Sequence, residues 1–191
     1  MTDVPTASPG PREALLAKAI AWFAEHGVGD TSLRTLATAL GTSHRMLIYH
    51  FGSREGLLGA VVEAVERGER AVMAEFLAAH ADPYEAGAAF WTHVAERAQI
   101  FAPLFFELSG TAMQGKPYAA SLRHWLATGW VDELADGFRR SGVGDEQAVR
   151  LARLSLGTAR GLLFELAVTG DRAAADAAMA EFTAMVRATS G

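Results

Sequence analysis

The sequence predicts an all-α protein. Alanine, leucine, glutamate and arginine dominate its 191 residues, and all four favour helices. Apolar residues recur at spacings of three and four, whereas period-two runs of valine, isoleucine and threonine are missing. Half of the residues are hydrophobic, which is enough to bury a core in one domain or in two small ones.

The first 80 residues predict an arm, three short helices and one long helix. Residues 1–10 are rich in proline, serine and threonine and are expected to be disordered. Pro11 suits a first helical turn, and Ser43 and Ser53 suit N-caps. Gly41 and Gly52 suit the ends of the second and third helices. The predicted helices cover 11–26, 33–40, 44–50 and 54–80.

The remaining residues predict a larger helical body. Asp82 and Pro83 break the chain after the long helix, and Pro103 is expected to interrupt the helix that follows. The predicted helices cover 84–101, 104–113, 118–140, 146–169 and 173–188. The predicted organisation is therefore an arm (1–10), a first domain (11–52), a connecting helix (53–80) and a helical body (81–191).

The predicted third helix has an apolar side and a polar side. At 100° per residue, Leu47, Ile48 and Phe51 share the side that packs on the preceding helix. His44 begins the helix, and its side is ambiguous. The opposite side carries Arg45, Met46, Tyr49 and, at its edge, His50.

Two short helices joined by a turn at Gly41 predict a helix-turn-helix. In that motif the second helix enters the major groove of DNA. Arg45 can then reach guanine or a phosphate, and Tyr49 and His50 can donate to phosphates. Thr42 and Ser43 lie at the helix N-terminus, which favours anions. The alternative on this pattern alone is an ordinary helical hairpin with a solvated outer face.

Four motifs extend the pattern: FAEHG ending the first helix, TSLRTLATALG in the second, HF ending the third and SREGLL opening the fourth. With them, residues 12–58 resemble the DNA-binding domain of the tetracycline-repressor (TetR-type) transcriptional regulators. The resemblance implies a dimeric repressor whose C-terminal domain binds a small molecule. The family usually has tyrosine where this chain has Ile48. The expected DNA-binding residues are Ser32, Arg34, Thr42, Ser43, His44, Arg45, Met46, Tyr49, His50 and Arg54.

Eight aromatic residues fall between residues 90 and 130. Bulky rings mixed with a few polar side chains suit a mostly apolar ligand cavity, although a filled core is the alternative. The expected contacts to a small, mostly apolar effector are Trp91, His93, Phe101, Phe105, Phe106, Glu107, Met113, Trp125, Trp130 and Phe164. The spacing of these residues does not demand a metal, and neither a metal nor a cofactor is expected.

The last two predicted helices combine leucines with small residues. Gly157 and Gly161 lie one turn apart and permit close approach of a second helix. Two such helices from each subunit would form a four-helix bundle with twofold symmetry. The alternative is that they only cover the core of the monomer. The expected interface residues are Leu151, Leu154, Ser155, Thr158, Gly161, Leu162, Leu166 and Phe182.

Several other classes of protein are disfavoured by the sequence. It has no cysteine and no apolar run of about 20 residues, and its N-terminus does not resemble a secretory signal. We therefore expect a cytoplasmic protein without a membrane partner. GTAMQGKP resembles a phosphate-binding loop, but Pro117 stands where the loop needs a hydroxyl. We expect that the protein is not an enzyme.

The predicted function is that of a ligand-responsive DNA-binding regulator. We expect a repressor that binds a palindromic operator and is released by its effector. Net charge is -5, and the neutral first third of the chain is less acidic than the rest. The alternative is a helical small-molecule-binding module without a DNA role. Two features favour it: the first third is neutral and not basic, and Ile48 stands where the family usually has tyrosine.

Overall fold

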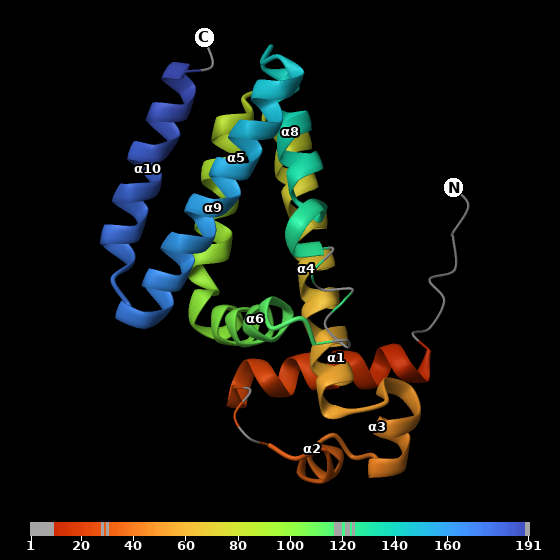
Figure 1. Cartoon of the computed structure of the whole chain (residues 1–191). Coiled ribbons are helices and arrows are strands. Elements are labelled where there is room, and N and C mark those ends of the chain that lie inside the picture. The colour runs from red at the N-terminus through yellow and green to blue at the C-terminus, as the bar shows by residue number, and fades with distance from the viewer. Residues whose placement is uncertain are drawn as a thin grey trace, which may run out of the picture. The chain divides into compact units, whose positions relative to one another are not determined.

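The computed structural model describes residues 10–27, 29, 31–116, 120, 123 and 125–189. The regular elements in these ranges are helical, as the sequence predicts. The chain divides into two compact units, Met1–Val61 and Val62–Gly191 (Figure 1). The boundary between the units falls inside a single long helix, α4 (Arg54–Ala79).

The first unit contains α1 (Pro11–His26), α2 (Leu33–Ala39), α3 (His44–Phe51) and the first two turns of α4. Serine side chains start the two short helices. Ser32 Oγ accepts a hydrogen bond from the Thr35 amide, and Ser43 Oγ accepts one from the Met46 amide, each at 3.2 Å. The buried side chains of this unit are Leu16, Ala19, Phe23, Leu33, Leu36, Ala37, Leu40, Leu47, Phe51, Leu57, Leu58, Ala60 and Val61.

The second unit is a helical body. After α4 it contains α5 (Pro83–Glu96), α6 (Ala98–Met113), a π-helical turn η2 (Trp125–Gly129), α8 (Val131–Arg140), α9 (Asp145–Thr169) and α10 (Arg172–Thr189). The last helix lies beside α9, at the edge of this unit (Figure 1).

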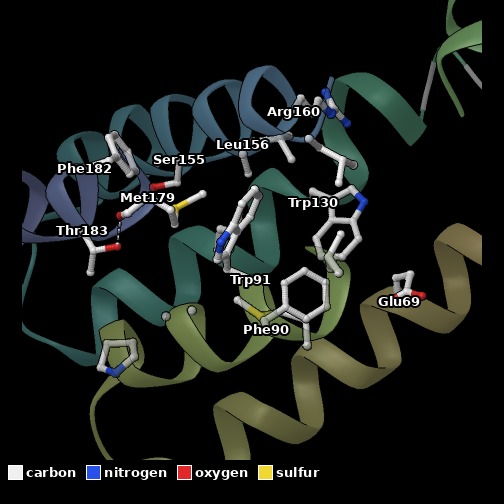
Figure 2. Close-up of a pocket in the computed structure, with 18 of the residues that line it drawn as sticks. Glu69, Phe90, Trp91, Trp130, Ser155, Leu156, Arg160, Met179, Phe182 and Thr183 are labelled. Carbon is white, nitrogen blue, oxygen red and sulfur yellow. Dashed lines mark hydrogen bonds between the residues drawn. The ribbon is translucent and has the colours of Figure 1, made fainter. Parts of the chain in front are cut away.

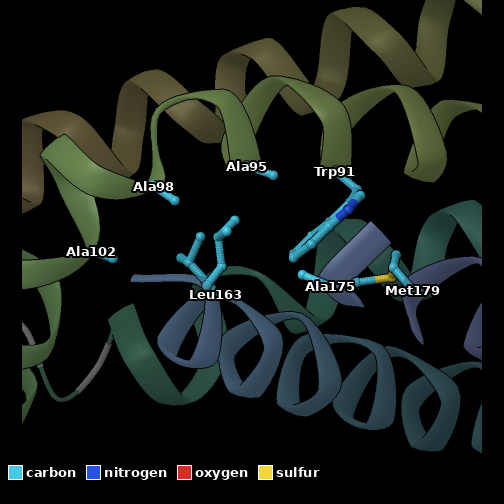
Figure 3. Packing of buried hydrophobic residues seen from close by; sticks show 8 residues of the cluster. Trp91, Ala95, Ala98, Ala102, Leu163, Ala175 and Met179 are labelled. Carbon is cyan, nitrogen blue, oxygen red and sulfur yellow. The ribbon is translucent and has the colours of Figure 1, made fainter. Parts of the chain in front are cut away.

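One core of the second unit joins α5 and α6 to α9 and α10. Ala95, Ala98 and Ala102 bring small side chains to the contact, and Leu163 of α9 faces them (Figure 3). Trp91 packs near Ala175 and Met179 of α10 in the same cluster. Small residues on one side and large ones on the other allow the helices to approach closely without voids.

Two predicted helix boundaries in this unit are wrong. Pro103 lies inside α6 and does not interrupt it, and the break falls at Arg97, whose φ is -104° and ψ 2°. Proline removes one backbone donor, but Ala102, Leu104 and Phe105 are all buried around it and hold the helix together.

The predicted helix 118–140 is also different. Its first residues, including Tyr118, lie outside the described residues. The described part contains the π-helical turn at Trp125–Gly129, and α8 begins only at Val131. Helix propensity does not distinguish a bond to the fourth preceding residue from one to the fifth, so the sequence could not show this turn.

Candidate functional site

The third helix presents a polar face to solvent. Leu47 and Phe51 are buried against the rest of the first unit, whereas Arg45 and Met46 are exposed and Tyr49 is 79% exposed. His44, which the sequence left ambiguous, is exposed as well. The face is thus an accessible helix surface over a fixed apolar base.

The prediction that Ile48 lies on the packed side of the helix is wrong, because its side chain is 40% exposed. Leu47 and Phe51 are only about 40° apart around the helix, while Ile48 lies about 100° from Leu47. The short helix α2 covers the narrow stripe and leaves Ile48 at its rim.

The residues around this face are basic although the unit as a whole is neutral. Residues 31–54 contain three arginines and two histidines but no aspartate or glutamate. Arg34 is exposed on α2, and Thr42 is partly buried in the turn, where its amide donates to the Ala37 carbonyl. The local charge therefore suits a polyanion better than the net charge does.

Two of the expected DNA-binding residues, Arg54 and His50, make contacts within the first unit. Arg54 donates from Nε to the Thr31 carbonyl at 3.0 Å and from Nη2 to the Gly29 carbonyl, which favours a role in holding the segment between α1 and α2. The ring of His50 lies between those of Tyr49 and Phe51, and its Nε2 is buried without a partner in the described part of the chain.

Arg12 of α1 was not predicted by the sequence reading. Its guanidinium carbon lies 5.2 Å from the centroid of the Phe51 ring, a cation–π contact that ties α1 to the end of α3. Because the contact joins residues 39 positions apart, the local pattern around Arg12 carries no signal for it.

The second unit contains a cavity of about 170 Å³. Its walls come from α4, α5, α6, α8, α9 and α10 and are mostly apolar and aromatic (Figure 2). Four of the predicted ligand contacts line it: Trp91, Phe101, Phe105 and Trp130. Phe90 and Met179, which were not predicted, lie with them around the same space (Figure 2).

The other predicted ligand contacts lie elsewhere. His93 is behind the wall, where its Nε2 donates to Glu69 at 2.9 Å. Phe106 packs edge-to-face on Phe164 at 5.3 Å outside the cavity. Glu107 and Met113 point to solvent, Met113 with 84% of its surface exposed. The Trp125 side chain lies outside the described residues. A cluster along the sequence cannot show which face of α6 is turned inward.

A buried carboxylate is the main polar feature of the cavity wall. Glu66 of α4 is only 7% exposed and accepts a hydrogen bond from the indole N–H of Trp130. Burial raises the pKa of Glu66, although the Trp130 hydrogen bond and the charges of Arg160 and Arg70 oppose that rise. Sequence reading missed Glu66 because a glutamate in a long helix resembles an ordinary solvated residue.

Arg160 is the cationic partner in the same wall. Its Nη1 donates to the Leu126 carbonyl at 3.1 Å, and its guanidinium carbon lies 5.7 Å from the centroid of the Phe105 ring. Burial lowers the pKa of Arg160. Its Nη2 is buried and has no hydrogen-bond partner among the residues that the structure describes.

The predicted dimer residues divide into three groups. Leu151 and Leu166 are buried in the cores of the monomer, so these two are not available to a partner. Ser155 and Phe182 line the cavity (Figure 2). The remaining predicted residues are exposed or partly exposed along α9: Leu154, Thr158, Gly161 and Leu162. Apolar periodicity marks a covered face but does not say whether the monomer or a partner covers it.

The exposed side of α9 continues beyond the predicted residues. Phe164, predicted as a ligand contact, is 53% exposed there, and Val168 follows one turn later. Met185 adds an exposed apolar side chain on α10. We call Leu154, Gly157, Gly161, Phe164 and Val168 the α9 stripe.

The described residues do not bring together three potential metal ligands. Among the described helices, none combines the length and apolarity that crossing a membrane requires.

Comparisons with known proteins point in one direction. Residues 15–61 match the sequence profile of the family described as bacterial regulatory proteins, tetR family. The HTH-type transcriptional regulatory protein RaaS of Mycobacterium tuberculosis is 33% identical over 123 residues, which are 63% of this chain and 54% of that protein. The match thus spans about half of that relative's length.

Two solved structures resemble nearly the whole chain. A TetR-family transcriptional regulator from Pectobacterium atrosepticum is 27% identical with a TM-score of 0.65, covering 93% of this chain and 91% of its own. A transcriptional regulator from Rhodococcus sp. Rha1 has a TM-score of 0.73 at 20% identity, covering 93% of this chain and 96% of its own. The second likeness concerns the fold alone.

Proposed function

We propose that this chain, which belongs to the TetR family of bacterial regulatory proteins, acts as an effector-controlled repressor. In this proposal a homodimer binds a palindromic DNA operator through α3. A small, mostly apolar molecule enters the cavity of the second unit and releases the protein from DNA.

The observation that carries the DNA role is the exposed face of α3. Arg45, Met46 and Tyr49 stand on a short helix whose opposite side is buried, and the surrounding segment has no acidic residue. Such a helix can lie in the major groove, with Arg45 at base edges and Tyr49 at a phosphate. Arg34 and Ser32, at the start of α2, are proposed as further contacts to the DNA backbone.

The proposed control depends on α4. This helix begins with Arg54 in the first unit and later contributes Glu66, Glu69 and Met73 to the cavity wall. A ligand that binds these side chains differently in two positions of α4 changes the DNA affinity, and DNA changes the ligand affinity by the same factor. Two half-sites about 34–36 Å apart would make DNA binding sensitive to such a shift.

The proposed homodimer uses the α9 stripe. Leu154, Phe164 and Val168 leave apolar surface exposed, and Gly157 and Gly161 lie between them on the same side. An Ala side chain at either glycine would meet no described atom within 4 Å in the monomer other than its chain neighbours and its own helix backbone, so the monomer itself gives no packing reason for glycine there. Mid-helix glycine costs about 1 kcal/mol relative to alanine, which a close-packed partner helix would offset.

Fluorescence anisotropy tests the proposal. A labelled duplex from the region upstream of the chain's own gene is titrated with protein at two salt concentrations, beside a scrambled duplex. We expect preference for the upstream duplex and a logarithmic salt slope of about -0.9 per phosphate contact. Equal, weak binding to both duplexes would count against a regulator of its own gene, and a scan of genomic fragments would then decide.

Ile48 favours a second candidate function, a helical small-molecule-binding module without a DNA role. Its side chain cannot donate to a phosphate, although it stands exposed beside Tyr49. Failure of every genomic fragment to bind, together with saturable ligand binding, would favour this candidate.

A further inference from the structure

In the cavity wall both carboxylates have hydrogen-bond donors, whereas two buried donor groups have no acceptor among the described residues. Both of its carboxylates already accept hydrogen bonds from the protein: Glu66 from Trp130 and Glu69 from His93. The buried polar side-chain atoms left without a partner in the described part of this wall are Arg160 Nη2 and the Tyr84 hydroxyl. Both of these groups can donate, and buried donors are rarely left unpaired.

Arg160 is held in place for such a contact. One of its terminal nitrogens is fixed by the Leu126 carbonyl, and the guanidinium lies over the Phe105 ring. Arg160 is one of the residues that line the cavity, and its remaining terminal nitrogen is buried without a hydrogen-bond partner among the described residues. A guanidinium fixed in this way binds a carboxylate or a similar oxyanion more strongly than it binds a neutral acceptor.

The rest of the cavity offers mainly apolar contacts. Figure 2 shows Arg160 and Trp130 towards one side of the space and Phe182 and Thr183 towards the other. Phe90, Trp91 and Trp130 turn their rings towards it, which suits a flat ring system by stacked or edge-to-face contacts. A cavity of about 170 Å³ corresponds to on the order of ten water-sized spheres, which is more than a single ion requires.

From these observations we propose that the cavity binds a flat apolar organic acid, with its anionic head group on Arg160 Nη2 and its hydrocarbon body among the aromatic rings. This inference rests on the proposed role of the cavity as the effector site. The opposite arrangement, an apolar cation on Glu66 and Glu69, is the competing outcome of the test, and the existing hydrogen bonds to both carboxylates disfavour it.

Three probes with one ring system and different heads test the inference: 2-naphthoate, 2-naphthamide and 2-naphthylmethylammonium. Isothermal titration calorimetry of the full chain near pH 7 keeps the acid ionised and the amine charged. We expect 2-naphthoate to bind about tenfold more tightly than the amide, because the charge-assisted hydrogen bond is the stronger one. Tightest binding of the cation, equal binding of acid and amide, or no binding of any probe would overturn the inference.

Arg160→Met separates the head-group contact from the cavity itself. We expect 2-naphthoate to lose its roughly tenfold advantage while the amide keeps its affinity within about twofold, which would also show that the cavity is intact. Arg150→Met on the same helix, at an exposed site paired with Glu146, is the matched control and should leave all three affinities unchanged. Unchanged binding of 2-naphthoate to Arg160→Met would reject the contact.

A separate anisotropy experiment distinguishes this inference from the proposed function. If 2-naphthoate binds through Arg160 but does not release the protein from DNA, the ligand site stands and the effector role of this compound fails. If DNA is not bound at all, the calorimetric result still decides the chemistry of the cavity.

Discussion

Trp130, at the start of α8, donates a hydrogen bond from its indole to the buried carboxylate of Glu66 on α4, 64 residues earlier in the chain. The contact joins two helices across the cavity wall. It also gives a hydrogen-bond donor to a carboxylate that is buried in mostly apolar surroundings. The stability of the second unit should therefore depend on this pair.

Trp130→Phe should lower the free energy of unfolding by about 1–3 kcal/mol, because it removes a donor from a buried acceptor while keeping an aromatic ring. Urea denaturation followed by circular dichroism measures the loss. Trp22→Phe, at a partly exposed site on α1, is the control and should have a much smaller effect. Equal losses for the two variants would mean that the hydrogen bond contributes little.

As the pH rises, the free energy of unfolding of Glu66→Gln should increase relative to that of the native protein. Burial raises the pKa of Glu66 above its ordinary value of 4.5, so the folded state binds this proton more tightly than the unfolded chain. At pH values below 4.5 the carboxyl is mostly neutral in both the folded and the unfolded state. As the pH rises above 4.5, ionisation of Glu66 lowers the free energy of unfolding, and this loss is complete once the pH exceeds the raised pKa of the folded state. Glutamine cannot ionise but still accepts from Trp130. Denaturation midpoints between pH 4 and pH 8 should diverge, and a constant difference would contradict the prediction.

Arg45→Ala should weaken operator binding by about 1–3 kcal/mol, which corresponds to roughly 5- to 150-fold. The side chain is exposed, so circular dichroism should show no change in folding. If Arg45 contacts a base, the loss will be smaller on a scrambled duplex; a uniform loss would indicate a phosphate contact instead. Arg150→Ala, on α9 of the second unit, serves as the control.

Ile48→Tyr should strengthen DNA binding by roughly fivefold, from about 1 kcal/mol for one added hydrogen bond. Family members usually have tyrosine at this position, and the exposed rim of α3 has room for a phenol. Anisotropy titrations of the two proteins on one operator provide the measurement. Ile48→Phe adds the ring without the hydroxyl, and a similar gain with phenylalanine would exclude the hydrogen bond as the cause.

Phe164→Asp should convert the proposed homodimer to a monomer without unfolding it. The side chain is 53% exposed in the monomer, whereas an aspartate buried at a subunit contact would be costly. Sedimentation velocity measures the oligomeric state. Met113→Asp makes the same change at an exposed site of α6 and should leave the dimer intact. A native-like dimer of Phe164→Asp would exclude the α9 stripe as the interface.

The sequence alone was enough for the helices of the first unit and, to within one residue, for their ends. Ser43 caps α3 and Gly52 ends it as predicted, because capping and the left-handed conformation of glycine depend on neighbours within one helical turn. Burial of Leu47 and Phe51 follows from their spacing, and the residues proposed to face DNA are largely those that this spacing leaves exposed.

Only the tertiary structure decided which faces of the second unit are core, cavity or exposed surface. Glu66, Arg160 and Trp130 come together from α4, α9 and the start of α8, and their separate positions in the sequence do not indicate a shared site. Phe164 and Leu166 are equally apolar, yet one is exposed and the other buried. Helical periodicity is set by hydrogen bonds four residues apart, whereas burial depends on which distant helix covers a face, and that is a non-local property of packing.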